Sequence, residues 1–142
     1  MAKNIIIDTG FWYALHDKRD EHYDVAQVLL EDIMTHTWLV PWPTLYETLN
    51  TSFVGRSDWL MSLESFFRKD SVYRVEDDIY RETAYGEVFP GTGQNVRRFS
   101  LVDLVIREML KDEQLKIDAL LTFDRPHYLD LCRKREVELL FP

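Results

Sequence analysis

The stretch Ile5-Ile6-Ile7-Asp8-Thr9-Gly10 decides the fold of this 142-residue chain. Three consecutive β-branched residues, closed by a carboxylate, a hydroxyl and a glycine, are typical of a strand that is buried on both faces and ends in a turn. Ala119-Leu120-Leu121-Thr122-Phe123, followed by Asp124, repeats this pattern near the other end of the chain. We therefore predict two strongly buried strands, each followed by an aspartate.

The rest of the chain alternates between weaker strand patterns and helical ones. Further strands are predicted at residues 38–40, 72–75 and 137–141. Strands that alternate with helices imply βαβ crossovers, so we predict an α/β fold in three layers, with a mostly parallel sheet between helices. The helical stripes, whose apolar residues recur every three or four positions, are Tyr23-Ala26-Leu29-Leu30-Ile33, Leu45-Leu49-Phe53 opened by Pro43, Leu60-Leu63-Phe67, Val102-Val105-Ile106-Met109 and Leu129-Cys132.

Composition limits the class of protein. The chain is 46% hydrophobic and has only 5 glycines and 5 prolines, which fits a single domain spanning residues 1–142. Its net charge of −8 argues against a broad basic surface for nucleic acid, although a metal ion held by carboxylates could still meet phosphate locally. A lone cysteine, Cys132, makes neither an intrachain disulfide nor a cysteine-based metal site, so a reducing cytoplasm is expected. The short apolar run at residues 5–7 predicts neither export nor membrane insertion.

Four acidic side chains fall where such a sheet binds ligands. Ligands of open α/β sheets bind beyond the carboxyl ends of the strands, where Asp8 and Asp124 are expected. Glu47 and Asp103 lie on predicted helices that could reach the same place. If the four carboxylates converge, their repulsion calls for a hard divalent cation, Mg²⁺ or Mn²⁺, which activates water and neutralises a scissile phosphodiester.

Each of these acids also has an ordinary structural interpretation. Asp8 and Asp124 are suited to cap the helices that follow them. Asp103 stands at the third position of a capping box, with Arg107 as its i+4 ion-pair partner. Glu47 faces away from the apolar stripe of its helix, as most solvated glutamates do.

The surroundings of the four acids resemble the motifs of PIN domains, especially the VapC-type toxin ribonucleases. Residues 5–15 are similar to the opening strand and aspartate of the family, and residues 20–26 to its second helix. Residues 44–49 resemble the helix that carries the family's glutamate. Residues 100–106 and 120–125 resemble the third and fourth acidic motifs. The motifs occur in the family's order and span nearly the whole chain.

The resemblance implies a five-stranded parallel sheet and Mg²⁺- or Mn²⁺-dependent endonucleolytic cleavage of RNA. It also implies an antitoxin protein as partner and a homodimer. The residues it assigns to catalysis and metal binding are Asp8, Glu47, Asp103 and Asp124, with hydroxyl groups that support them on Thr9 and Thr122.

One segment departs from the family pattern. Residues 86–99 are expected to form a longer glycine-bearing loop before the third motif, which affects substrate contacts but not the acids. Arg97 and Arg98 at its end either reach an RNA phosphate at the mouth of the site or are solvated surface residues.

Three other classes of protein are alternatives to the nuclease. A phosphoaspartyl phosphatase needs a second acid where Gly10 stands, and a receiver domain needs an acidic pair where Thr9 stands. A PIN-like scaffold that binds protein or RNA without cutting is the non-enzymatic alternative, and the retention of all four acids argues against it.

Overall fold

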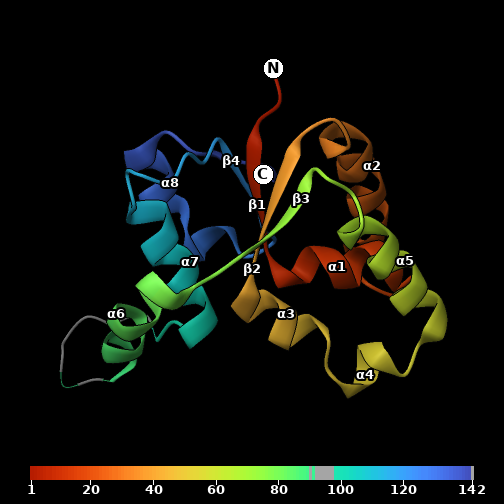
Figure 1. Ribbon diagram of the computed structural model, residues 1–142, viewed down its shortest axis with the longest axis horizontal. Helices are drawn as coiled ribbons and strands as arrows, with labels where there is room; N and C mark the ends of the chain where they lie inside the picture. Colours follow the sequence, from red (N-terminus) through yellow and green to blue (C-terminus); the bar gives the residue numbers. More distant parts are fainter. Residues whose placement is uncertain (90, 92–97, 142) are drawn as a thin grey trace.

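The computed structural model describes residues 1–89, 91 and 98–141, and within them a five-stranded sheet runs through the middle of the molecule (Figure 1). The strands lie in the order β3-β2-β1-β4-β5, and each neighbouring pair is parallel. The predicted parallel sheet is confirmed, with β1 at its centre. The strands are β1 (Asn4–Ile7), β2 (Thr37–Pro41), β3 (Val72–Val75), β4 (Ala119–Leu121) and β5 (Glu138–Leu139).

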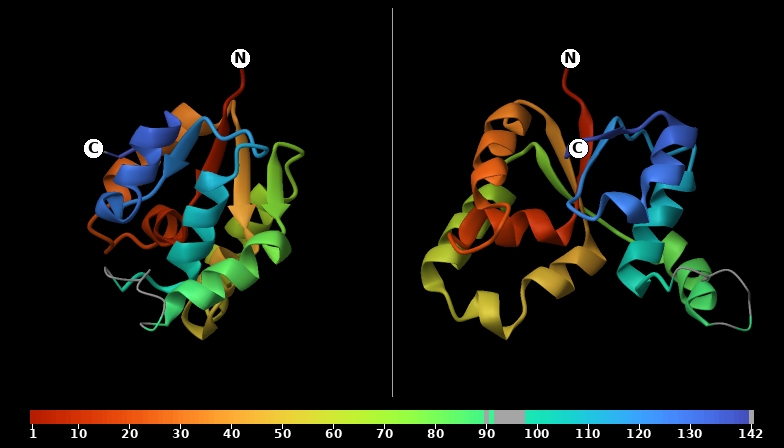
Figure 2. Two further views of the ribbon diagram at one scale, coloured as in Figure 1. Left: turned by 90° about the vertical axis from the view of Figure 1, so that its left-hand side faces the viewer. Right: turned by 180° about the vertical axis from the view of Figure 1, so that it is seen from behind.

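Helices cover both faces of the sheet, which confirms the predicted three layers (Figures 1 and 2). One face packs against α1 (Thr9–His16), α2 (Tyr23–Ile33) and α5 (Ser57–Phe67), and the other against α6 (Asp78–Val88), α7 (Leu101–Lys111) and α8 (Leu129–Arg135). In the part of the chain that the structure describes, no helix combines the length and apolar character needed to cross a membrane. The shorter helical segments are α3 (Trp42–Thr48), α4 (Thr51–Val54) and the 3₁₀ turn η2 (Arg125–His127).

The three isoleucines of β1 explain why this strand is the centre of the fold. Ile5 and Ile7 belong to the core on one face of the sheet, and Ile6 belongs to the core on the other. Successive side chains of a strand point to opposite faces, so a strand between two helical layers needs an apolar residue at every position. After the three isoleucines, the next polar group is placed at the carboxyl end of the strand, at Asp8.

The order of the strands reverses beside β1. The chain proceeds from β1 outward through β2 to β3, and then returns to the other side of β1 to form β4 and β5. Ligands of open α/β sheets bind at such a switch point. The Asp8 N–H donates to the carbonyl of Leu121 at 3.0 Å, so the carboxyl ends of β1 and β4 lie side by side there.

The predicted stripe Leu45-Leu49-Phe53 does not form one helix. Helix α3 ends at Thr48, and α4 starts after Asn50, whose side-chain oxygen accepts hydrogen bonds from two N–H groups of α4. Asparagine competes for backbone donors in this way and therefore favours helix starts over helix interiors. The prediction of a single helix was wrong because this cap was not recognised.

The predicted loop at residues 86–99 begins later than expected. Helix α6 was not predicted from the sequence, and it continues through Gly86 to Val88. The remaining loop positions 90 and 92–97 lie outside the described residues.

Replacement of Ile6 by alanine tests the packing between the layers. Ile6 is completely buried, so Ile6→Ala should lower the free energy of unfolding by about 2 to 5 kcal/mol. Val28→Ala on α2 is the control, because Val28 is 59% exposed and its loss should cost less than about 0.5 kcal/mol. Urea unfolding of both variants measures the difference, and equal effects would contradict the assigned core.

Candidate active site

All four predicted acids line one pocket. It has a volume of about 480 Å³ and lies at the carboxyl ends of β1 and β4. Helices α1, α3 and α7 also contribute to its walls. The lining residues are Asp8, Thr9, Gly10, Tyr13, Glu47, Asn50, Ser100, Asp103 and Asp124.

Asp8 lines this pocket and is only 6% exposed. Its Oδ1 accepts a hydrogen bond from the Thr9 N–H at 2.8 Å, which caps α1 as one interpretation of the sequence expected. Its Oδ2 accepts from the Thr122 hydroxyl, also at 2.8 Å. The Thr122 oxygen in turn accepts from the N–H of Asp124 at 3.0 Å. Thr122 therefore ties the end of β1 to the segment after β4.

The environment of Asp8 favours its protonated form. Burial is the largest cause and raises the pKa of Asp8 from 3.8 to about 6. Hydrogen bonds from Thr122 and Thr9 oppose this rise, whereas the charges of Asp103 and Asp124 add to it. The carboxylates of the pocket therefore lie close enough to repel one another.

Asp103 has a structural role as well as a place in the pocket. Its N–H donates to the Ser100 hydroxyl at 3.1 Å, and its Oδ2 accepts from the Ser100 N–H at 3.2 Å, which completes the capping box predicted for α7. Its Oδ1 accepts from the hydroxyl of Tyr128 at 2.9 Å. The Nδ1 atom of His127 lies 3.2 Å from Oδ2. Both carboxylate oxygens of Asp103 thus have partners, although the residue also lines the pocket.

The predicted ion pair between Asp103 and Arg107 is wrong. Arg107 instead donates to both carboxylate oxygens of Asp130, at 2.9 and 2.8 Å, and to the carbonyl of His127 at 2.7 Å. The planar guanidinium fits the two oxygens of Asp130 as a fork, a stronger geometry than a single i+4 contact. This arrangement joins α7 to the start of α8.

The remaining two acids are more exposed. Oε1 of Glu47 accepts a hydrogen bond from the Thr9 hydroxyl at 2.7 Å, so α1 and α3 are linked across the pocket. Asp124 occupies the N-cap position of η2, but its side chain makes no capping hydrogen bond. The structure therefore gives Asp124 no helix-capping role that would explain its carboxylate.

Sequence reasoning missed three polar residues of the site. Tyr13 and Asn50 line the pocket, and the Asn50 amide donates to the Tyr13 hydroxyl. Their spacing was a usable signal, because Tyr13 is four residues after Thr9 on α1 and Asn50 closely follows Glu47. No local pattern marks Tyr128, since its buried hydroxyl meets Asp103 only through the tertiary fold.

The arginines predicted to contact RNA lie at the edge of what the structure describes. Arg98 is exposed and does not line the acid pocket, and Arg97 lies outside the described residues. Among residues 1–89, 91 and 98–141, no group of three or more His, Cys, Asp or Glu side chains is arranged so that it could hold a metal ion as it stands. The four acids share a pocket without forming a closed ligand shell.

Solved structures have this architecture. VapC20 of Mycobacterium tuberculosis, a toxin that cleaves the sarcin-ricin loop, matches with a TM-score of 0.67 at 18% identity, over 89% of this chain and 94% of that chain. VapBC2 of Rickettsia felis, solved with a DNA fragment from its promoter, matches with a TM-score of 0.56 at 17% identity, over 96% of each chain. This chain has the VapC-type PIN-domain fold. The sequence itself matches no protein-family model and no curated protein. The VapC-type likeness thus concerns the fold, and the function is inferred from the site.

Asp8→Asn should show a stability difference that depends on pH. A carboxyl group whose pKa rises on folding stabilises the protein at low pH, and this contribution is lost as pH rises through the folded value of about 6. With EDTA present, the variant should therefore gain about 2 kcal/mol relative to the wild type between pH 4 and pH 7. Urea unfolding across this range measures the difference.

Asp32→Asn is the matched control for this titration. Asp32 is exposed on α2 and does not line the acid pocket, so its variant shows what the loss of a carboxylate elsewhere does over the same pH range. Matching profiles for the two variants would contradict a raised pKa of Asp8 in the folded protein.

Proposed function

We propose that this chain is a divalent-metal-dependent endoribonuclease that hydrolyses RNA phosphodiester bonds, as the toxin of a toxin–antitoxin pair. One observation carries the proposal: four carboxylates from separate elements line one pocket at the switch point of a VapC-type fold. Helix capping explains the positions of Asp8 and Asp103, but not those of Glu47 and Asp124.

The donor set of the pocket fits Mg²⁺ or Mn²⁺. Both ions prefer oxygen ligands, and the repulsion that contributes to the raised pKa of Asp8 is what a cation would relieve. The ion, when bound, would supply a Lewis acid that activates water and neutralises charge on the scissile phosphate. The residues that would hold it are Asp8, Glu47, Asp103 and Asp124.

The surrounding hydrogen bonds prepare these carboxylates for such a role. Thr122 donates to Asp8, Thr9 donates to Glu47, and Tyr128 donates to Asp103. Groups that orient ligands in this way are a regular part of metal sites. Glu47 is the most solvent-accessible of the three acids held in this way, which suits it to accept a proton from the attacking water.

The proposal extends to partners. RNA is the substrate, and contacts from Arg97 and Arg98 to its phosphates remain part of the proposal. VapC20 cleaves the sarcin-ricin loop, so this loop is one substrate to test. A partner antitoxin is suggested by the VapBC2 complex, and a homodimer by the family resemblance. Residues 1–142 would form one nuclease domain that acts in the cytoplasm.

One observation favours a second candidate function. The described residues hold no preformed group of metal ligands. A PIN-like scaffold that binds RNA or protein without cutting it would not need such a group. Direct assays of cleavage and of metal binding separate the two candidates.

Purified protein should cleave RNA only with a divalent ion. A pool of random RNA and a sarcin-ricin loop RNA should be cut in Mg²⁺ or Mn²⁺, and excess EDTA should abolish cleavage reversibly. Asp8→Asn and Glu47→Gln should each lower the rate by about a hundredfold or more, because each removes one of the pocket's carboxylates.

The controls replace exposed acids of α2 in the same way. Asp32→Asn and Glu31→Gln should cleave at the wild-type rate. Full activity in EDTA would contradict the metal mechanism. RNA binding without cleavage in any divalent ion would instead support the scaffold.

Thermal unfolding tests the metal site independently of activity. Mn²⁺ at about a hundred times its dissociation constant should raise the wild-type melting temperature by about 5 to 10 °C, because it binds only the folded state. The rise should be much smaller for Asp103→Asn, which keeps an oxygen for the capping box but loses the charge.

Asp130→Asn is the matched control for this shift. Asp130 pairs with Arg107 outside the acid pocket, so its variant should lose stability yet keep the full Mn²⁺ increment. An undiminished increment in Asp103→Asn would show that this residue serves α7 as a cap and does not bind the ion.

A further inference from the structure

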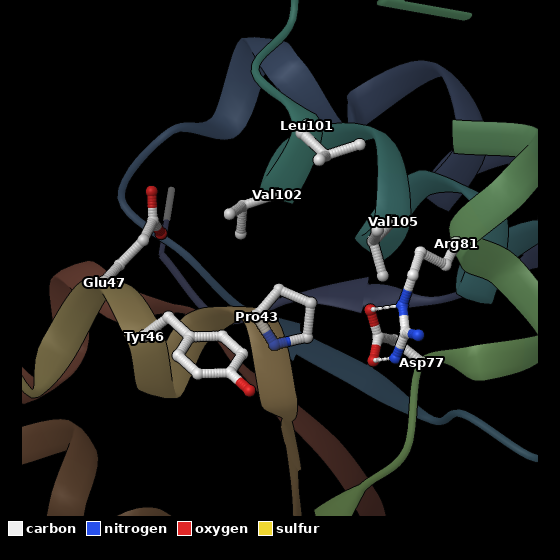
Figure 3. Close-up of a pocket in the computed structure, with 8 residues that line it drawn as sticks. All are labelled: Pro43, Tyr46, Glu47, Asp77, Arg81, Leu101, Val102 and Val105. Atoms are coloured by element: carbon white, nitrogen blue, oxygen red, sulfur yellow. Dashed lines mark hydrogen bonds and ion pairs between the residues drawn. The ribbon is translucent and has the colours of Figure 1, made fainter. Parts of the chain in front are cut away.

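A second pocket opens beside the acid pocket, between α3, α6 and α7 (Figure 3). It has a volume of about 540 Å³, within the usual range of small-molecule sites. Glu47 lines both pockets, so the second pocket adjoins the candidate active site. Its lining residues are Pro43, Tyr46, Glu47, Asp77, Arg81, Leu101, Val102 and Val105.

The middle of this pocket is apolar and its two ends are polar. Figure 3 shows Glu47 at one end, the side chains of Pro43, Val102 and Val105 between, and an ion pair at the other end. In that pair Arg81 donates to both oxygens of Asp77, at 2.9 and 3.4 Å. Asp77 is only 8% exposed, whereas the Arg81 side chain is 56% exposed, so the buried carboxylate holds a guanidinium that solvent can reach.

An exposed aromatic ring borders the apolar part. Tyr46 projects from α3 and is 79% exposed, although it is a large side chain with apolar area to bury. From its own helix, its ring contacts the ring of Trp42 at a centroid distance of 6.3 Å. A ring in this position offers a flat surface to a molecule that enters the pocket.

Charge decides which part of an RNA this pocket suits. Among the described residues, Arg81 is the only cation that lines this pocket, and it is paired with Asp77. A phosphate group is therefore disfavoured here. A neutral, flat group whose edge forms hydrogen bonds fits the apolar walls, the exposed ring and the ion pair together.

We propose that this pocket binds a nucleobase of the RNA next to the scissile bond, and thereby sets the sequence preference of cleavage. The base stacks on Tyr46, and its edge meets the Asp77–Arg81 pair. Stacking on aromatic side chains and hydrogen bonding to base edges are the usual means of reading unpaired RNA. The inference rests on the proposed function, because the RNA is its substrate.

An apolar segment of a partner protein would also fit the apolar walls. Two observations favour the base. The ion pair at the far end offers donors and acceptors that an aliphatic or aromatic side chain would leave unused. Because Glu47 lines both pockets, this pocket lies beside the site where the bond would be cut. A base next to the scissile bond could therefore reach it.

The test compares the cleavage of RNA that carries each flanking base with the cleavage of RNA that lacks it. A short single-stranded RNA carrying the cleavage site that the wild type selects from a random pool is prepared with an abasic residue at each flanking position in turn. Removal of one particular base should lower kcat/KM of the wild type by about tenfold. On the intact RNA, the kcat/KM of Tyr46→Ala should be lower than that of the wild type by about the same factor. On the RNA that lacks this base, the kcat/KM of Tyr46→Ala should equal that of the wild type. Arg81→Lys, which removes the planar fork, should change which base is preferred.

Matched variants control for loss of a ring or a fork elsewhere. Tyr73→Ala removes an exposed tyrosine of β3, and Arg68→Lys alters an exposed i,i+4 pair of α5 with Glu64. Both should keep the wild-type preference. If Tyr46→Ala and Arg81→Lys also cleave with that preference, the nucleobase inference is overturned while the nuclease stands. If they keep the preference but lose inhibition by a partner protein, the pocket belongs to that protein and the inference is again overturned.

A binding measurement decides the inference even if the wild type cuts no RNA. The four ribonucleosides are titrated into protein labelled at the methyl groups of Leu101, Val102 and Val105, which face this pocket in Figure 3. Shifts of these methyl resonances that disappear in Tyr46→Ala would support the base subsite, whether or not the protein cleaves RNA. Unchanged resonances with every nucleoside would overturn it.

Discussion

The pairing of β1 with β4 is the constraint on which the rest of this structure depends. Their hydrogen bonding continues to the last position, where the Asp8 N–H meets the Leu121 carbonyl and the Thr122 hydroxyl meets the Asp8 carboxylate. The two strands lie between helical layers, so polar groups are confined to their ends. Asp8 and Asp124 therefore lie at the carboxyl ends of β1 and β4, and helices α1 and α7 begin beside them.

Gathering carboxylates at this edge has an energetic consequence. Asp8 is buried, and its pKa of about 6 means that holding it ionised at neutral pH costs folding free energy. Proteins commonly retain such unfavourable groups where function requires them. The hydrogen bonds from Thr9 and Thr122 limit that cost without neutralising the charge. Uncharged donors thus orient the carboxylates of the site and leave their negative charge in place.

Much of the fold could be predicted because it depends on local pattern. The run Ile5-Ile6-Ile7 specifies a strand buried on both faces, and its end specifies where Asp8 must lie. Helix α6 escaped prediction because its apolar face is weak: only Tyr80 and Ala84 are buried in it, while Ile79 is 72% exposed. A pattern this sparse does not separate a helix from a polar connection.

The candidate site could be predicted only in part, for a related reason. The four acids were found from their positions at strand and helix ends, and the structure places them in one pocket. The supporting hydroxyls of Thr9 and Thr122 were found as well. Tyr128 was not found, because it reaches Asp103 through tertiary packing, as Asp130 reaches Arg107. Sequence spacing along one helix favoured the wrong partner for Arg107. Whether the acids bind metal stays a prediction.

The capping box at the start of α7 links the inheritance of activity to that of stability. Because Asp103 both lines the pocket and accepts from the Ser100 N–H, most substitutions there would weaken the start of α7 as well as alter the site. Selection for stability would therefore act on this side chain even in a lineage where the pocket served no purpose. Asparagine or glutamine would keep an oxygen for the Ser100 N–H while removing the charge, so a neutral amide at this position would mark a relative whose pocket has lost one of its four carboxylates.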